Sequence, residues 1–178
     1  MDKKIRIATA WLGGCSGCHM SFLDLDERLL ELRERAELVY SPVMDIKEFP
    51  ANVDATLVEG AVANEDNREL LLRIRANTRV LVAFGDCAVT GNVTAMRNTL
   101  DRDEMLREIY GSIGPEFGKA PFHPLPVLEP SVSPIHRVVP VDAYLPGCPP
   151  HADLIWHVIT ALLEGRTPTL SEDLLSYG

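Results

Sequence analysis

The sequence is organised around Gly13-Gly14-Cys15-Ser16-Gly17-Cys18, a glycine-rich stretch that holds two of the four cysteines of the chain. Before it, residues 3–10 place Ile5 and Ile7 at alternate positions and end in small residues, as in a strand that runs into a turn. After it, residues 21–35 repeat apolar side chains every three or four positions, which predicts an amphipathic helix. The two thiols are therefore expected at a strand-to-helix turn.

The remaining chain alternates further strands with helices. We expect strands at 37–40, 54–62, 79–84 and 137–142, a helix capped by Asn64, an interrupted helical segment at 90–110, a long ordered loop at 111–134 and a last helix at 151–164 that ends at Gly165. This alternation predicts an α/β fold: a flavodoxin-like, doubly wound, mostly parallel sheet with helices on both faces. We expect one domain over residues 1–178, with 166–178 as a short tail.

Composition excludes several classes of function. Carboxylates outnumber basic side chains 26 to 17 and the formal net charge is -9, so the chain lacks the basic surface that nucleic-acid binding requires. The sequence shows no secretory signal and no apolar run long enough to cross a membrane, so we expect a cytoplasmic protein without direct membrane insertion. In that compartment thiols stay reduced, which favours metal or redox chemistry for the cysteines over disulfides.

The four cysteines follow the ends of three predicted strands. Cys15 and Cys18 come after the first strand, Cys87 after the fourth and Cys148 after the last. Because the carboxyl ends of parallel strands lie at one edge of a sheet, all four thiols are expected at the edge where such folds bind ligands.

Four thiols at one edge suit a [4Fe–4S] cluster, which is usually held by four cysteine thiolates among glycine- and proline-rich loops. Two other interpretations remain open at this point. A structural zinc ion also takes four cysteines, although commonly from two CxxC pairs, whereas this chain has one such pair and two single cysteines. A thioredoxin-type dithiol explains Cys15 and Cys18 but gives no role to Cys87 and Cys148.

Four short motifs occur in order between residues 11 and 150. They are Trp11-Leu12-Gly13-Gly14-Cys15-Ser16-Gly17-Cys18, Val58-Glu59-Gly60, Gly85-Asp86-Cys87-Ala88 followed by Gly91, and Pro146-Gly147-Cys148-Pro149-Pro150. Together they resemble the small subunit of [NiFe] hydrogenases, and in pattern and size the small subunit of soluble, bidirectional, NAD-reducing hydrogenases.

This resemblance implies one [4Fe–4S] cluster, ligated by Cys15, Cys18, Cys87 and Cys148 and proximal to a nickel–iron centre on a large subunit. The cluster would carry electrons to iron–sulfur and flavin (diaphorase) subunits, so that the complex catalyses H2 + NAD+ = H+ + NADH. Acceptor binding belongs to other chains, which leaves NADP or the deazaflavin F420 as alternatives. A zinc-stabilised interaction module is the alternative from a different class.

Departures from the wider family narrow this expectation. Membrane-bound and periplasmic relatives carry a twin-arginine signal and a C-terminal extension for two more clusters; neither is visible here, so we expect a single cubane. The related subunit of respiratory complex I has adjacent cysteines in its first motif, whereas two residues separate Cys15 from Cys18. Asn92 stands where many relatives have a second glycine, which puts the local turn in question but not the ligand.

Glu59 matches the Glu-Gly of the family and is expected at a strand end, where it would support the cluster loop or relay protons; the alternative is a solvated strand-end carboxylate. For Trp11 and His19 a role beside the cluster competes with a purely structural one. The flavodoxin-like fold also makes FMN a candidate cofactor of this chain. The turn after the first strand, however, lacks the Ser/Thr-rich character of a flavodoxin phosphate loop. We further expect an exposed apolar surface, including parts of 111–134, that the large subunit covers.

Overall fold

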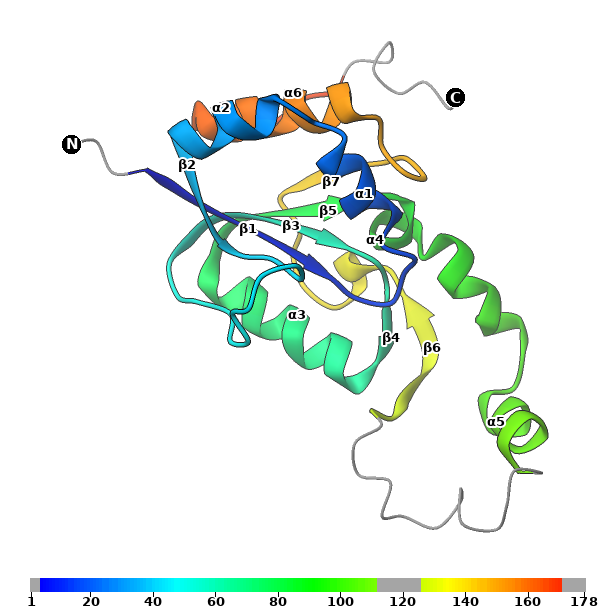
Figure 1. Cartoon of the computed structure of the whole chain (residues 1–178). Coiled ribbons are helices and arrows are strands. Elements are labelled where there is room, and N and C mark those ends of the chain that lie inside the picture. Colours follow the sequence, from blue (N-terminus) through cyan, green and yellow to red (C-terminus); the bar gives the residue numbers. More distant parts are fainter. Residues whose placement is uncertain (1–3, 112–125, 171–178) are drawn as a thin grey trace.

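The computed structural model describes residues 4–111 and 126–170 and contains a five-stranded parallel sheet (Figure 1). The strands are β1 (Ile5–Trp11), β2 (Ala36–Tyr40), β3 (Val53–Glu59), β5 (Thr78–Phe84) and β7 (Ala143–Leu145), in the spatial order β2-β1-β3-β5-β7. Counted within this sheet the order is 2-1-3-4-5, the flavodoxin-like arrangement that was predicted. Every strand pair in it is parallel.

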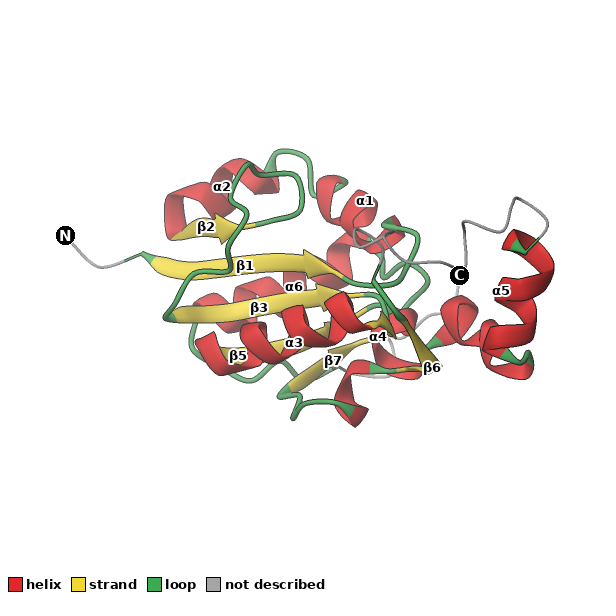
Figure 2. Cartoon of the chain, turned by 90° about the horizontal axis from the view of Figure 1, so that it is seen from below, coloured by secondary structure: helices red, strands yellow, loops and turns green. Residues whose placement is uncertain are grey.

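Helices cover both faces of the sheet (Figure 2). α1 (Gly17–Leu23), α2 (Arg28–Arg35) and α6 (Ala152–Leu163) pack on one face, where Phe22, Leu32, Ile155 and Val158 meet the sheet residues Ile7, Leu57 and Phe84. α3 (Glu65–Asn77), α4 (Asp86–Thr90) and the 3-10 helix η2 (Ile135–Arg137) pack on the other, through Leu71, Ile74, Ala88 and Ile135. Successive side chains of each strand point to opposite faces of the sheet and so contribute to two separate apolar cores.

The helix predicted at 21–35 is broken into α1 and α2. The turn between them contains Asp26 with φ 49, a left-handed conformation that Asp adopts more readily than most residues. The break lets Leu25, which is 2% exposed, point into the core below α1 and α2. The spacing of apolar residues correctly predicted which side chains are buried, but it could not show the turn between α1 and α2.

The last predicted strand, 137–142, is wrong. Residues 135–137 form η2 instead, and the strand β7 follows at Ala143–Leu145. Pro140 has no N–H to donate to a neighbouring strand, which disfavours a strand here. The segment is apolar because Val139 packs in the core, and not because it belongs to the sheet. Cys148 still follows the last strand, as the site prediction requires.

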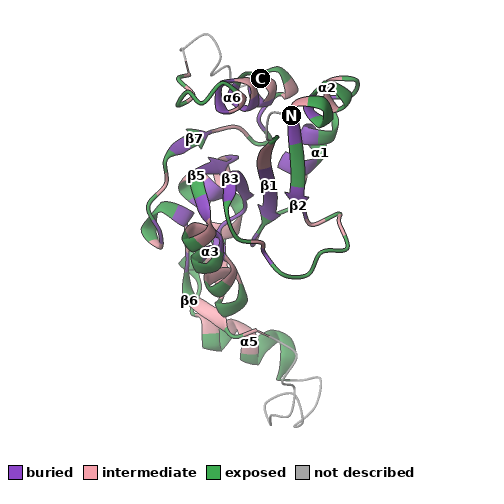
Figure 3. Ribbon diagram, turned by 90° about the vertical axis from the view of Figure 1, so that its left-hand side faces the viewer, coloured by how far each residue is buried: buried purple, intermediate pink, exposed green. Residues whose placement is uncertain are grey.

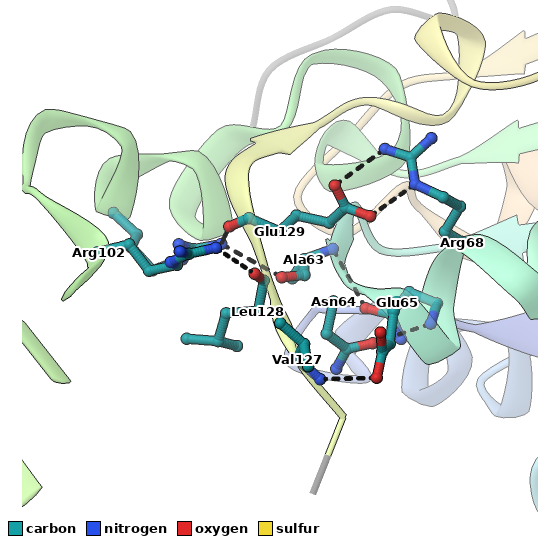
Figure 4. Close-up of polar contacts among 10 residues, drawn as sticks. Ala63, Asn64, Glu65, Arg68, Arg102, Val127, Leu128 and Glu129 are labelled. Carbon is teal, nitrogen blue, oxygen red and sulfur yellow. Dashed lines mark hydrogen bonds and ion pairs between the residues drawn. The ribbon is translucent and has the colours of Figure 1, made fainter. Parts of the chain in front are cut away.

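Part of the predicted loop at 111–134 is a strand, and residues 112–125 of it lie outside the described ranges. β6 (Leu128–Ser133) pairs antiparallel with β4 (Val62–Asn64) in a small second sheet. The helical segment after α4 is interrupted as predicted, into the 3-10 helix η1 (Asn92–Thr99) and α5 (Arg102–Tyr110). Arginines from η1, α5 and α3 bind β6 at this corner of the molecule (Figure 4).

Two smaller predictions are confirmed. The side chain of Asn64 accepts a hydrogen bond from the backbone N–H of Asn67 at 2.8 Å and so caps α3. Gly165 follows the end of α6 with φ 71, the left-handed conformation that often ends a helix. No helix in the described ranges is long and apolar enough to cross a membrane.

Candidate metal centre

The first two cysteines lie in the turn between β1 and α1. The turn ends at Ser16, which has φ 66 and precedes the first residue of α1. Cys18 is buried in the first turn of that helix, whereas Cys15, just before it, is exposed. The same short turn thus presents one thiol to the interior and one to the surface.

The other two cysteines lie in the turns that follow β5 and β7. Cys87 occupies the first turn of the short helix α4 and is half-buried. Cys148 is exposed in the turn between β7 and α6. Because β1, β5 and β7 are parallel, these three turns share the carboxyl edge of the sheet, as predicted.

The environment of Cys18 shows that the other three thiols lie within electrostatic reach of it. Burial raises the pKa of the Cys18 thiol, the Glu59 carboxylate raises it further, and Cys87, Cys15 and Cys148 add to the same shift. A thiol in this environment keeps its proton unless a metal displaces it. Cys18 itself is therefore a poor nucleophile for thiol–disulfide exchange.

Backbone hydrogen bonds hold the Cys87 and Cys148 turns together. The N–H of Gly85 donates to the carbonyl of Leu145 at 2.7 Å, and the N–H of Asp86 donates to the carbonyl of Gly147 at 2.9 Å. In return, the Asp86 carboxylate accepts the N–H of Gly147 at 2.7 Å. Three hydrogen bonds thus connect the two turns directly.

A hydroxyl connects the Cys148 turn to α1. Ser21 Oγ, which is buried, donates to the carbonyl of Pro150 at 2.5 Å. On the other side of the edge, Thr94 Oγ1 of η1 donates to the carbonyl of Gly13 at 3.1 Å. Each cysteine turn is thus bound to a neighbouring element. The sequence analysis included Asp86 in a motif without giving it a role, and it missed Ser21 and Thr94 as parts of the site.

Glu59 lies below the first cysteine turn and is 2% exposed, so it is not a solvated strand-end residue. Its Oε2 accepts the backbone N–H of His19 at 2.9 Å and lies 2.5 Å from Nδ1 of the same residue. The ring of His19 is itself buried, with Trp11 edge-on at a centroid distance of 5.4 Å. A carboxylate that binds the residue next to Cys18 is placed to fix that turn.

The glycines of the edge leave room that no other residue would leave. A Cβ on Gly85 would lie 2.1 Å from Cys18 Sγ, and this residue has φ 82. A Cβ on Gly147 would lie 2.5 Å from Cα of Pro150, with φ 135. Both positions require glycine on conformational as well as steric grounds.

The chemistry of the donor set fits an iron–sulfur cluster. Four cysteine thiols on glycine-rich turns are the ligands that a [4Fe–4S] cluster usually takes.

The turn after β1 offers little to the phosphate of a flavin. The N–H groups of Leu12 and Gly13 already donate to the carbonyls of Glu59 and Ala61, at 2.8 and 2.9 Å. A flavodoxin-type site instead leaves such amides free for the phosphate. Bound FMN stays a prediction that these contacts do not support.

Comparison with known proteins identifies the family. The model of the NADH ubiquinone oxidoreductase 20 Kd subunit family matches residues 15–162, a range that includes all four cysteines. The chain belongs to this family. Among its relatives, the NAD-reducing hydrogenase HoxS subunit delta of Cupriavidus necator is 42% identical, with 99% of this chain and 87% of that protein covered.

A second relative belongs to an F420-non-reducing hydrogenase of Methanothermobacter marburgensis and is 43% identical over 93% of this chain. The chain spans only 56% of the length of that protein. Among solved structures, a chain of an NAD+-reducing [NiFe]-hydrogenase in the H2-reduced state matches with a TM-score of 0.89 and 43% identity, covering 99% of this chain and all of that one.

These relatives confirm the predicted resemblance to the small subunits of [NiFe] hydrogenases. A [NiFeSe]-hydrogenase chain at 19% identity and a TM-score of 0.58 shares the fold alone.

Proposed function

We propose that this chain is the electron-transfer subunit of a cytoplasmic, NAD-reducing [NiFe] hydrogenase, and that Cys15, Cys18, Cys87 and Cys148 hold a single [4Fe–4S] cluster. The observation that carries the proposal is the meeting of the four thiols at one edge of the sheet, in turns that hydrogen bonds hold to one another. When bound, such a cluster accepts and releases one electron at a time.

The residues of the chain would bind and orient this group. The buried Cys18 and the closely packed Gly85 exclude water from its inner side, while Asp86 keeps the Cys87 and Cys148 turns at a fixed separation. Glu59 fixes the Cys15–Cys18 turn through His19 and is a positioning residue in this proposal. Rigid turns reduce the reorganisation that accompanies electron transfer, and backbone amides near the sulfurs tune the potential.

NAD+ is proposed as the final acceptor because the NAD-reducing relative is matched along most of its length, whereas the F420-non-reducing relative extends far beyond this chain. The complex would then contain a large subunit with the nickel–iron centre and iron–sulfur and flavin subunits. NADP+ and F420 are the alternatives that an assay has to separate. Hydrogen-dependent reduction of each acceptor by the purified complex does so directly.

The test of the cluster uses the complex purified anaerobically through a tag on this chain. We expect about four irons with matching labile sulfide per copy of the chain, and an EPR signal after reduction. Cys148→Ser should remove most of this iron, whereas Tyr144→Phe in the preceding strand β7 should leave it unchanged. One zinc and no iron would favour the interaction module, and full iron in Cys148→Ser would remove that residue from the ligand set.

A further inference from the structure

A cavity of about 560 Å³ lies beside β2, the edge strand of the parallel sheet, on the face that α1 and α2 cover. Figure 3 shows these two helices next to β1 and β2. The inner wall of the cavity is apolar and includes Ile7 of β1, Phe22 of α1 and Leu32 of α2, all of which are buried. Sites that bind small molecules have volumes in this range and are lined mainly by apolar side chains with a few polar groups.

Two buried polar side chains, Ser41 and His19, also line the cavity. Ser41 Oγ has a partner, since it accepts a hydrogen bond from Thr9 Oγ1 at 3.0 Å. The ring of His19 is paired on one side alone: Nδ1 lies 2.5 Å from Glu59 Oε2, whereas Nε2 is buried and has no hydrogen-bond partner among the described residues. A buried polar atom without a partner is costly, so one that belongs to a cavity wall points to a ligand.

The charged residues of the cavity lie at its mouth. Lys4, Arg33 and Glu37 are exposed, and Lys4 Nζ donates to the carbonyl of Arg33 at 2.5 Å. Val43 is 68% exposed and lies at the same opening. Among the described residues that line the cavity, no Asp, Glu, Lys or Arg is buried. Because burying a charge without a partner is costly, this interior favours an uncharged occupant.

We propose that the cavity binds a small, uncharged, largely apolar molecule with one hydroxyl group, which pairs with Nε2 of His19. A hydroxyl both donates and accepts, so it satisfies this nitrogen whether or not the nitrogen carries a proton. The apolar body of the molecule lies against Phe22 and Leu32, where its surface leaves water. This site is separate from the cysteine edge, because none of the four cysteines lines the cavity.

The test compares 4-butylphenol with butylbenzene, which has the same apolar body without the hydroxyl. Equilibrium dialysis against the complex purified anaerobically through a tag on this chain measures the binding of both. We expect the phenol to bind at least tenfold more tightly, since the hydrocarbon leaves Nε2 of His19 unpaired. The hydroxyl is removed from the probe because the His19 side chain also binds Glu59.

Variants of the chain locate the binding site. Val43→Trp places a large side chain at the mouth and should weaken the binding of 4-butylphenol at least tenfold. Val93→Trp is the matched control, because Val93 on η1 is 62% exposed and lies outside the cavity; it should change nothing. Ser41→Ala removes the other hydroxyl of the wall and should keep the preference for the phenol.

Three outcomes would overturn the inference. Equal binding of the two probes would remove the role of the hydroxyl, and equal weakening by Val43→Trp and Val93→Trp would remove the cavity as the site. Loss of the preference in Ser41→Ala would transfer the hydroxyl from His19 to Ser41. Probe binding is measured without reference to the cluster, so a complex without iron would defeat the proposed function and leave this inference standing.

Discussion

The cysteine edge and the corner formed by β4 and β6 both join segments that are far apart in the sequence, but they use different chemistry. At the edge, the connections are backbone amides, two hydroxyls and two carboxylates, and residues 12–23, 87–96 and 143–150, which carry the cysteines, contain no Asp, Glu, Lys or Arg. At the corner, arginines make the connections: Arg102 donates to the carbonyl of Leu128, and Arg68 binds the Glu129 carboxylate through two nitrogens (Figure 4).

The two regions also differ in burial. β6 and α5 are largely exposed or half-buried, whereas β3 and β5 are buried at their carboxyl ends and β1 is buried up to its last residue, Trp11, which is exposed (Figure 3). Exposed ion pairs are individually weak and can replace one another, so no single arginine should decide the corner. Each cysteine turn instead depends on one or two short contacts. Single substitutions should therefore cost more at the edge than at the corner.

The largest effect is expected for Gly85→Ala. The new Cβ would lie 2.1 Å from Cys18 Sγ, and alanine also disfavours a φ of 82. Overpacking of this kind costs about 1–3 kcal/mol and here displaces a proposed ligand. We expect loss of most of the iron and of the EPR signal in the purified complex.

The matched control is Gly165→Ala. Gly165 also has a positive φ, 71, but a Cβ there would meet nothing within 4 Å. Gly165→Ala should lower the unfolding free energy by about 1 kcal/mol, while the iron content stays at the wild-type value. Equal iron loss in both variants would mean that backbone strain, and not contact with Cys18, decides the result.

A smaller effect is expected for Asp86→Ala. This change removes the acceptor for the N–H of Gly147 and loosens the Cys148 turn from the Cys87 turn, at a cost of about 1 kcal/mol. Asp86→Asn keeps an acceptor oxygen, so it should retain most of the stability and of the iron that Asp86→Ala loses. Urea unfolding, together with the rate at which a chelator removes iron, measures both consequences.

Asp103→Ala is the control for the loss of a carboxylate, because Asp103 is exposed and binds only its neighbour Arg102 among the described residues. It should change neither the unfolding midpoint nor the rate of iron removal. If Asp86→Ala also left the rate of iron removal unchanged, the Asp86–Gly147 contact would have no part in holding the two turns together.

The sequence alone predicted four of the five strands of the parallel sheet and the edge that carries the thiols, because both follow from local patterns and from the geometry of parallel strands, whereas the last strand was placed at 137–142 instead of Ala143–Leu145. It missed the contacts that secure the site. Ser21 binds a carbonyl 129 residues away, and Thr94 binds one 81 residues away, so neither leaves a signal in its own neighbourhood. The β4–β6 pairing was missed for the same reason, and Pro130 further hides β6 as a strand.

The smallest effect is expected at the corner, for Arg68→Gln. The hydrogen bond from Arg68 lowers the pKa of the Glu129 carboxyl. The stabilisation is therefore complete above the ordinary pKa of a glutamate and is lost as the pH falls through the lowered pKa of the folded state. Because Arg68 is 43% exposed, we expect less than about 1 kcal/mol at neutral pH.

Urea unfolding of the wild type and of Arg68→Gln, from neutral pH to about pH 3.5, measures this difference. The two curves should converge at the acidic end and under high salt, which screens exposed pairs. Arg35→Gln, which removes an exposed pair within α2, should show a difference no larger. A loss of several kcal/mol in Arg68→Gln would show that the corner depends on one contact, as the cysteine edge does, and would remove the contrast between the two regions.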